Sequence, residues 1–306
     1  MRIYDCFTFY NEFELLELRL ESLHDFVDYF IIVEADKTQR NESKPFYFLQ
    51  NKSRFSKFLP KIRHLMMNVS VEYKGGDVID WVIENTQRDY IKHGLFDAKC
   101  DDLILISDLD EIPNPQIFND IINSDRVALF SQCLLPYHIP FPSAFANKNV
   151  SVPCQLLVRA ADFLEVSPIV LNQVLHRYYF DLAKKDGFWQ GTVMTLYKKM
   201  PTPQTLRNLR TMLPRVNDGG HHFSSMGGID RVIDKVRAIC EGRSIKDSDT
   251  AYKEFVKECI AQGSYLSVEN NAGTRTFFPY DINKIKLPYL EKFIKKYPYF
   301  LSSHQS

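Results

Sequence analysis

Three carboxylates follow a short apolar run in the segment LILISDLDEIP, residues 103–113. They are Asp108, Asp110 and Glu111. Carboxylates that crowd at one strand tip repel each other, and burial raises the cost. A bound divalent cation removes that penalty, and Mg²⁺ and Mn²⁺ favour oxygen ligands, often one or two carboxylates together with substrate phosphates. The Asp-x-Asp pair of Asp108 and Asp110 therefore suggests a site for a metal ion and a diphosphate.

The same pair has a second interpretation, as a solvated acidic turn that caps the following helix. An Asp-x-Asp pattern is weak by itself, since the chain carries another at 247–249 within the polar run RSIKDSDT. That second copy follows no apolar strand pattern, and we predict that it lies on the surface. Spacing alone leaves both interpretations of Asp108 and Asp110 open.

Arg88 and the pair His221-His222 are further candidates for the same chemistry. The guanidinium of Arg88 suits phosphate oxygens, although a surface salt bridge is an equally open interpretation. The histidines lie in DGGHHFSSMGG, residues 218–228, whose glycines permit close backbone approach or movement. A neutral histidine could complete a metal shell. The alternative is that both are ordinary loop residues.

The first 125 residues alternate between strand and helix patterns. Strands are predicted at 3–10, 27–36, the second part of 54–67 and 101–113, and helices at 11–26, the first part of 54–67 and 77–95. This order predicts an α/β fold, a sheet with a parallel core flanked by helices. Ligands of such sheets bind beyond the carboxyl ends of the strands. Three of these ends carry polar residues: Asn11-Glu12, Glu34-Ala35-Asp36 and Asp108-Leu109-Asp110.

The second part of the chain has shorter patterns. Strands are predicted at 126–139, 154–164 and 191–200, a loop at 218–228, and helices at 229–242 and 287–301. The sequence has no repeat and no low-complexity segment. We therefore predict a single domain that covers residues 1–306.

Composition excludes some functions and suggests a compartment. Lysine plus arginine and aspartate plus glutamate are 38 each, so nothing predicts a general nucleic-acid binder. The amino terminus MRIYDCFTFYNE lacks the apolar stretch of a signal peptide, and no window approaches the ~18–20 apolar residues of a membrane span. We predict a cytoplasmic protein of bacterial or viral origin, and peripheral membrane association stays open. The cysteines, which we expect to be mostly buried thiols, are Cys6, Cys100, Cys133, Cys154, Cys240 and Cys259.

Four segments in a fixed order give the chain a resemblance to glycosyltransferase family 17. They are DCFTFYNEFELLELRLESL, VDYFIIVEAD, ISDLDEIP and GGHHFSSMGG, with a weaker contribution from LPYLEKFIKKYPYFL. The resemblance implies a GT-A fold, with a Rossmann-like mixed sheet, as one catalytic domain. In that domain residues 1–125 would bind the nucleotide sugar and residues 126–306 the acceptor. It also implies a divalent metal, Mn²⁺ or Mg²⁺, and inversion at the anomeric carbon.

The resemblance also assigns roles to individual residues. Asp108 and Asp110 match the Asp-x-Asp positions, and His222 matches the histidine of a Gly-Trp-His-x-Ser stretch in which His221 here replaces tryptophan. These three are the expected metal site. Arg88 and Lys235 match basic residues of the donor site, to which we also assign Asn11, Glu12, Glu34 and Asp108.

A one-step inversion requires a general base for the acceptor hydroxyl. Asp230 falls where the family is expected to have a glutamate, and it is our candidate, with Glu111 and Asp186 as reserves. Asp230 could equally be the acid at a helix amino terminus, favoured there by the macrodipole.

The expected reaction is transfer of a sugar, N-acetylglucosamine being one candidate, from a UDP-sugar to a hydroxyl of a glycan acceptor. Paired carboxylates also suit a metal-dependent nucleotidyltransferase or phosphohydrolase, which would usually need further acids around two metals. A catalytically silent carbohydrate-binding protein is the third interpretation.

Overall fold

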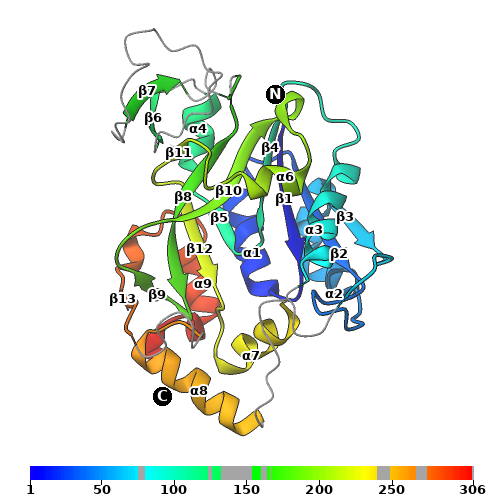
Figure 1. The fold of residues 1–306 in the computed structure, drawn as a ribbon. Coiled ribbons are helices and arrows are strands. Elements are labelled where there is room, and N and C mark those ends of the chain that lie inside the picture. Colours follow the sequence, from blue (N-terminus) through cyan, green and yellow to red (C-terminus); the bar gives the residue numbers. More distant parts are fainter. Residues whose placement is uncertain are drawn as a thin grey trace.

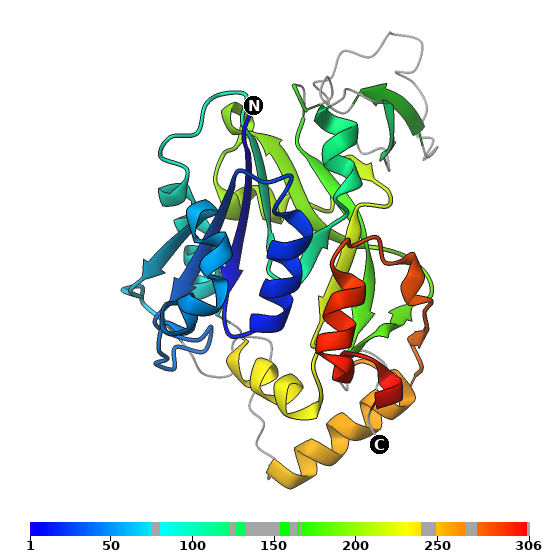
Figure 2. The ribbon, with the colours of Figure 1, turned by 180° about the vertical axis from the view of Figure 1, so that it is seen from behind.

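The computed structural model describes residues 1–74, 80–122, 126–131, 154–159, 164–165, 167–239, 249–266 and 274–304. These residues form a mixed α/β structure around one large curved sheet, with helices packed against it (Figures 1 and 2). The predicted α/β class is therefore confirmed. The second Asp-x-Asp copy begins outside the described residues, so its predicted surface position stays a prediction.

The amino-terminal half builds the parallel core. Its strands lie side by side in the order β3-β2-β1-β4 and are all parallel. The predicted alternation of strands and helices is confirmed here. The elements are β1 Ile3–Phe9, α1 Phe13–Leu23, β2 Tyr29–Ala35, α2 Tyr47–Asn51, the 3₁₀ helix η1 Lys52–Lys61, β3 Ile62–Met67, α3 Val82–Asp89, the 3₁₀ helix η2 Tyr90–Gly94, and β4 Leu103–Asp108.

Strand β1 explains why these segments form a buried parallel sheet. Successive side chains of a strand point to opposite faces. Ile3 and Phe7 join the larger hydrophobic cluster, to which α1 and α9 contribute, whereas Tyr4 and Cys6 join a second cluster with residues of η2 and α6. Because both faces are covered, the strand is mostly apolar, as parallel strands usually are, and its charged residue Asp5 is buried.

The second half extends the sheet with antiparallel pairs. Strand β10 pairs antiparallel with β4, and β8 pairs antiparallel with β10. The amino-terminal part of β8 also pairs with β11, while its carboxyl-terminal part pairs with β12 and β9. The sheet elements are β5 Glu111–Pro113, β6 Arg126–Ser131, β7 Cys154–Arg159, β8 Ile169–Arg177, β9 Tyr179–Lys184, β10 Trp189–Leu196, β11 Arg215–Val216, β12 Gly220–Ser224 and β13 Phe277–Pro279.

Helices and short 3₁₀ turns complete this half. In Figure 1, α7 lies below the carboxyl ends of the parallel strands, and α8 crosses the bottom of the molecule. The helices are α4 Gln116–Ile122, α6 Pro203–Asn208, α7 Ile229–Ala238, α8 Asp249–Gln262 and α9 Leu290–Lys296. The 3₁₀ turns are η4 Tyr197–Lys199, η5 Ile282–Lys284, η6 Pro298–Phe300 and η7 Ser302–His304.

Two sequence predictions are wrong at the point where the chain changes sheet partner. Residues 101–113 are not one strand, because β4 ends at Asp108 and β5 then pairs with β12 instead of continuing along β1. Residues 218–228 are not all loop, because β12 inserts between β5 and β8. Gly220 makes this insertion possible: its φ is +126°, and a side chain there would lie 2.8 Å from Pro113 Cα.

Several other predicted boundaries shift. The strand predicted at 191–200 ends at Leu196, and the helix predicted at 287–301 is interrupted before Pro298. The predictions at 126–139, 154–164 and 229–242 are confirmed for β6, β7 and α7, and their remainders fall largely outside the described residues. The sequence patterns do not predict strands β8, β9, β11 and β13 or helices α2, α4, α6 and α8.

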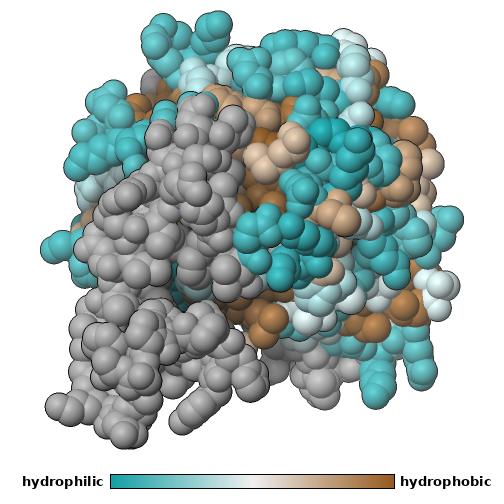
Figure 3. All heavy atoms as spheres, turned by 90° about the horizontal axis from the view of Figure 1, so that it is seen from above, coloured by the Kyte–Doolittle hydropathy of each residue, from teal (hydrophilic) through white to brown (hydrophobic). Residues whose placement is uncertain are grey.

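The surface seen from the amino-terminal end of the parallel strands is largely hydrophilic where it is described (Figure 3). Among the cysteines whose side chains are described, Cys6 and Cys259 are buried thiols as expected, but Cys100 is exposed. No helix in the described ranges is long and apolar enough to cross a bilayer.

Candidate functional site

The candidate site surrounds the turn between β4 and β5. Asp108 is the last residue of β4, and the chain reverses through Leu109 and Asp110 before Glu111 begins β5. The side chain of Asp108 is 35 % exposed, whereas Asp110 is nearly buried and Glu111 is fully buried. The three acids of the sequence motif thus have three different environments, and each is engaged by different partners.

Two guanidinium groups hold the carboxylate of Asp108. Arg88 Nη2 lies 2.8 Å from Oδ1, and Arg207 Nη2 lies 2.9 Å from Oδ2. Arg88 also pairs with Glu84 at 2.7 Å. Burial would raise the pKa of the Asp108 carboxyl, but the adjacent Arg207 and Arg88 outweigh burial and hold that pKa far below its usual range. Asp108 is therefore a carboxylate at every physiological pH.

Glu111 has a supporting position behind Asp108. Its carboxylate accepts hydrogen bonds from Arg207, from the indole Nε1 of Trp189 and from the backbone N–H of Asp108. It is fully buried. Glu111 therefore orients Arg207, and its hydrogen bond from the Asp108 N–H stabilises the turn between β4 and β5.

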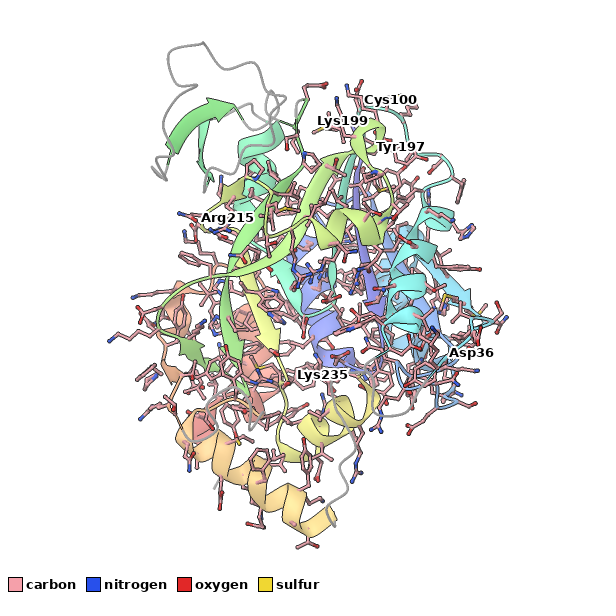
Figure 4. The ribbon with its side chains drawn as sticks, in the orientation of Figure 1. Asp36, Cys100, Tyr197, Lys199, Arg215 and Lys235 are labelled. Atoms are coloured by element: carbon pink, nitrogen blue, oxygen red, sulfur yellow. The ribbon has the colours of Figure 1, made fainter. Side chains whose placement is uncertain are left out.

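Asp110 forms a second ionic cluster with helix α7 and strand β12. Lys235 Nζ lies 2.6 Å from Asp110 Oδ2 and 2.9 Å from Glu12 Oε1, and His222 Nε2 lies 3.4 Å from Asp110 Oδ1. Burial would raise the pKa of Asp110, but Lys235 and His222 hold it well below its usual range. Figure 4 labels Lys235, which lies between α7 and the lower ends of the parallel strands. Residues 12, 110, 222 and 235, far apart in the sequence, meet here.

The two adjacent histidines have opposite surroundings because they lie on a strand. His222 faces the site, with its ring centroid 4.8 Å from that of Trp189. His221 points the other way. Its Nδ1 lies 2.9 Å from Nε2 of the buried His176. Burial lowers the pKa of His221 to about 4, so its ring is neutral near pH 7. Of the pair, only His222 is available to a ligand of the site.

An open cleft of about 1310 Å³ runs past these groups. One part borders the ends of β1 and β2, with Thr8, Tyr10, Lys37, Thr38, Gln39 and Lys44. The central part holds Glu12, Arg88, Asp108, Asp110, Trp189, Arg207, His222 and Lys235. The part beside β8 and α8 is more apolar, with Leu175, Arg177, Tyr252, Phe255, Tyr265 and Leu266. The cleft is therefore chemically graded, ionic at its centre and aromatic toward α8.

Arg210 differs from the cations Arg88, Arg207 and Lys235 of the cleft. Its guanidinium lies over the Trp189 ring at 5.6 Å from the centroid, and it donates a long hydrogen bond to the Arg207 carbonyl. Burial and the nearby Arg207 lower its pKa. Within the described residues Arg210 has no carboxylate within ion-pair distance, whereas Arg88, Arg207 and Lys235 each have at least one. An anion that entered the cleft would find Arg210 uncompensated.

The structure brings most, but not all, of the predicted site residues together. Glu12, Arg88, Asp108, Asp110, His222 and Lys235 all line the cleft. Asn11 does not line it, and neither does Glu34, which is buried and accepts hydrogen bonds from the Phe48 N–H and His64. The assignment of Glu34 to the donor site is therefore not supported, because its oxygens stabilise α2 and β3 instead.

Asp230, the proposed general base, lies apart from the site. Its side chain is 83 % exposed, in the first turn of α7, and pairs with Lys253 at 2.8 Å. It does not line the cleft. Of the two reserve candidates, Glu111 is fully buried and Asp186 is exposed in the turn between β9 and β10, and neither lines the cleft. The position of Asp230 matches the alternative interpretation, in which it is a helix-terminal acid.

The donor set suits a divalent cation only in part. Asp110 and His222 are close enough to share an ion, and His222 Nδ1 is buried without a hydrogen-bond partner among the described residues. Both oxygens of Asp108 are instead committed to arginines. In the described ranges no three His, Cys, Asp or Glu side chains converge as a metal site. Asp110 and His222 could hold an ion that also binds substrate phosphate, but Asp108 does not fit as a ligand.

Sequence reasoning missed Arg207, Arg210, Trp189, Glu84 and Arg19. Arg207 lies in the last turn of the short helix α6, which has no strong periodic pattern, and Trp189 begins β10 just before the predicted strand. An isolated arginine or tryptophan carries no local signal of a site. Only the chain path brings these residues to the Asp108–Glu111 turn.

Comparison with known proteins points to one family. The sequence model of glycosyltransferase family 17 matches residues 1–129, which confirms the resemblance for that part. The β-1,4-mannosyl-glycoprotein 4-β-N-acetylglucosaminyltransferases of Rattus norvegicus and Homo sapiens are each 28 % identical over 118 residues. That of Mus musculus is 27 % identical over the same length. Each match covers 37 % of this chain and 22 % of the relative, so the chain spans about a fifth of the length of these relatives.

Proposed function

We propose that the protein is a glycosyltransferase with a GT-A-type fold that moves a sugar from a UDP-sugar to a hydroxyl of a glycan acceptor. The family match over residues 1–129 supports the reaction class. The observation that carries the proposal is the ionic centre of the cleft, where Asp108 and Asp110 lie among Arg88, Arg207 and Lys235. Fixed cations around a strand-end turn suit a donor substrate whose leaving group is a nucleoside diphosphate.

The donor would bind with its diphosphate at this centre. Arg210 has no carboxylate to displace, so it would bind a phosphate oxygen at the least cost, and Lys235 would shift toward the diphosphate from Asp110. The nucleoside would extend toward Thr8, Tyr10 and the end of β1, in keeping with ligand binding beyond the carboxyl ends of parallel strands.

Mn²⁺ or Mg²⁺ would be held by Asp110 and His222, with donor phosphate oxygens as further ligands. When bound, such an ion stabilises the negative charge that develops on the leaving diphosphate. The protein itself supplies fixed positive charge through Arg88, Arg207 and Arg210, and Asp108 holds the first two in place.

The acceptor would occupy the aromatic part of the cleft. The rings of Tyr252 and Phe255 lie 6.1 Å apart on α8, and Arg177 lies 5.1 Å from the Tyr265 ring. Such rings can pack against the apolar face of a sugar. A direct, inverting displacement needs a general base that lines the cleft. Glu12 lines the cleft and pairs with Lys235, whereas Asp230 lies outside the lining, so Glu12 fits the role of base better than Asp230.

The rival interpretations have less support. A two-metal phosphohydrolase or nucleotidyltransferase needs further acids around its ions, and within the described residues the acids of the cleft are paired with cations. A carbohydrate-binding protein without activity would use the aromatic part of the cleft but would have no need of the ionic centre. Binding of nucleotide separates this last case from an enzyme.

The test is calorimetry of UDP binding with Mn²⁺ and after EDTA, followed by assays of transfer from UDP-sugars to glycans. We expect UDP to bind more tightly with Mn²⁺, and GDP and CMP to bind more weakly. Arg210→Gln should weaken UDP binding about tenfold, whereas Arg215→Gln, a control labelled in Figure 4 and outside the cleft lining, should not change it. A protein that binds glycan but no nucleotide would contradict the proposal, and equal affinity with and without metal would remove the metal from it.

A further inference from the structure

Arg19 is a fully buried charge that the chemistry described above does not use. It lies on α1, and its guanidinium forms a two-pronged ion pair with Asp5 of β1, also fully buried. The distances are 2.6 Å from Nη2 to Oδ1 and 2.7 Å from Nε to Oδ2. The Phe7 ring centroid lies 4.4 Å from the guanidinium carbon. Neither Arg19 nor Asp5 lines the cleft, so neither can touch a substrate.

The remaining donors of Arg19 all reach the Asp-x-Asp turn. Nη2 donates to Ser107 Oγ at 2.6 Å. Nη1 donates to the backbone carbonyls of Asp108, Leu109 and Glu111 at 2.9, 3.0 and 3.0 Å. Every N–H of the guanidinium therefore has an acceptor, which offsets much of the cost of its burial.

This arrangement fixes the backbone that carries the site carboxylates. Three carbonyls that point toward one guanidinium define the path of the chain from Asp108 to Glu111. On the other side of the turn, the Asp110 carbonyl accepts from the Phe223 N–H at 2.8 Å. A lysine at position 19 would provide one compact ammonium in place of a planar fork, and it could not reach Asp5, Ser107 and the carbonyls together.

We infer that Arg19, oriented by Asp5, is a positioning residue that sets the direction of the Asp108 and Asp110 carboxylates from beneath the turn. The inference rests on the proposed function for its kinetic consequences and on the structure alone for its effect on the turn. An ordinary core ion pair would affect only the stability of the whole protein. A positioning role of Arg19 would in addition affect the turn that carries the site carboxylates.

The experiment compares Arg19→Lys, the double variant Asp5→Asn/Arg19→Met, and the control Arg63→Lys. Arg63, on the edge strand β3, pairs with Asp97 at 2.6 Å and lies outside the cleft lining. The double variant leaves no unpaired buried charge, so it keeps the test usable where a single change prevents folding. Amide hydrogen exchange, thermal unfolding, UDP affinity and the separate kcat and KM of transfer are measured on each.

We expect exchange of the amides of residues 108–112 to be at least about tenfold faster in both Arg19 variants than in Arg63→Lys at matched thermal stability. We also expect kcat to fall by about tenfold or more in the Arg19 variants, with a smaller rise in KM for acceptor, and no change in kcat for Arg63→Lys. Unchanged exchange in the turn, or a loss of kcat that only follows the loss of stability, would overturn the inference. A wild-type protein that binds no nucleotide contradicts the proposed function instead, and the exchange result still decides the role of Arg19.

Discussion

At the scale of single residues, identity matters less than which partners a side chain meets. Asp108 and Asp110 are two positions apart, yet the first is held by two arginines and the second by Lys235 and His222. The two carboxylates therefore have different roles. Asp108 holds two arginines in place, whereas Asp110 is the carboxylate that could bind a metal ion together with a phosphate of the substrate.

Asp110→Asn tests this division. The change removes the charge that faces Lys235 and His222 while Glu12 still pairs with the lysine, so we expect the fold to persist and transfer to fall by at least about 100-fold. Thermal unfolding and steady-state kinetics measure both effects. Activity above about a tenth of wild type would show that Asp110 has no essential role.

The histidine pair offers a matched comparison on neighbouring positions. His222→Ala should weaken Mn²⁺-dependent UDP binding about tenfold and cost less stability than the change at His221, because His222 borders the cleft and its contact with Asp110 is long, 3.4 Å. His221→Ala should instead lower the free energy of unfolding by about 2–4 kcal/mol, because it removes a buried ring and its hydrogen bond to His176. Chemical denaturation and calorimetry on both variants give the two readouts, and the reverse pattern would contradict the strand assignment of β12.

At the scale of elements, the site depends on strand β12 lying between β5 and β8. This pairing turns His222 toward Asp110 and brings the Phe223 N–H to the Asp110 carbonyl. Gly220 begins the strand at a φ that L side chains rarely adopt, with the backbone of Pro113 and Asn114 close by. The glycine is therefore required by the crossing of the strands, and not by movement of a loop.

Gly220→Ala should destabilise the protein by about 3 kcal/mol or more, because the new methyl group meets backbone atoms, such as Asn114 N at 2.7 Å, that cannot move aside cheaply. Gly187→Ala is the matched control, since Gly187 also has a positive φ, +81°, but no neighbouring atom within 4 Å. There the cost should be about 1 kcal/mol. Denaturant unfolding of both variants measures the difference, and equal costs would mean that β12 can shift to make room.

At the scale of the whole molecule, the two ends of the parallel sheet have different roles. The carboxyl ends carry the site, and the amino ends are tied together by acids and arginines. Asp102, which is buried just before β4, accepts hydrogen bonds from the backbone N–H groups of Arg2 and Lys99 and from the Arg2 side chain. This cluster joins β1 and β4 without any part in the cleft.

The amino-terminal cluster predicts a loss of stability in acid. Burial would raise the pKa of Asp102, but the Lys99 and Arg2 hydrogen bonds and the Arg2 charge lower it below its usual value. The stabilisation is therefore complete above the unfolded pKa, about 3.9, and is lost as the pH falls through the lower folded value. Asp102→Asn should be less stable at pH 7 and lose less on acidification than the wild type. Unfolding measured from pH 7 to pH 2 checks this, and parallel pH profiles would contradict it.

The sequence by itself determined the parallel core and the location of the acidic turn. Apolar strands that alternate with amphipathic helices have few arrangements that bury both faces of a sheet, and the carboxyl ends of such strands lie at one edge. That logic was enough to place Glu12, Asp108 and Asp110 in one site.

The tertiary structure decided which cations serve those acids and which residues stay away from them. Arg207, Arg210 and Trp189 reach the cleft only because β10 pairs antiparallel with β4 and α6 returns beside it, and no local pattern encodes that path. Glu34 and Asp230 carry the right chemistry but face the core and the solvent. Residue type and spacing specify what a side chain can do, whereas long-range pairing of strands specifies what it meets.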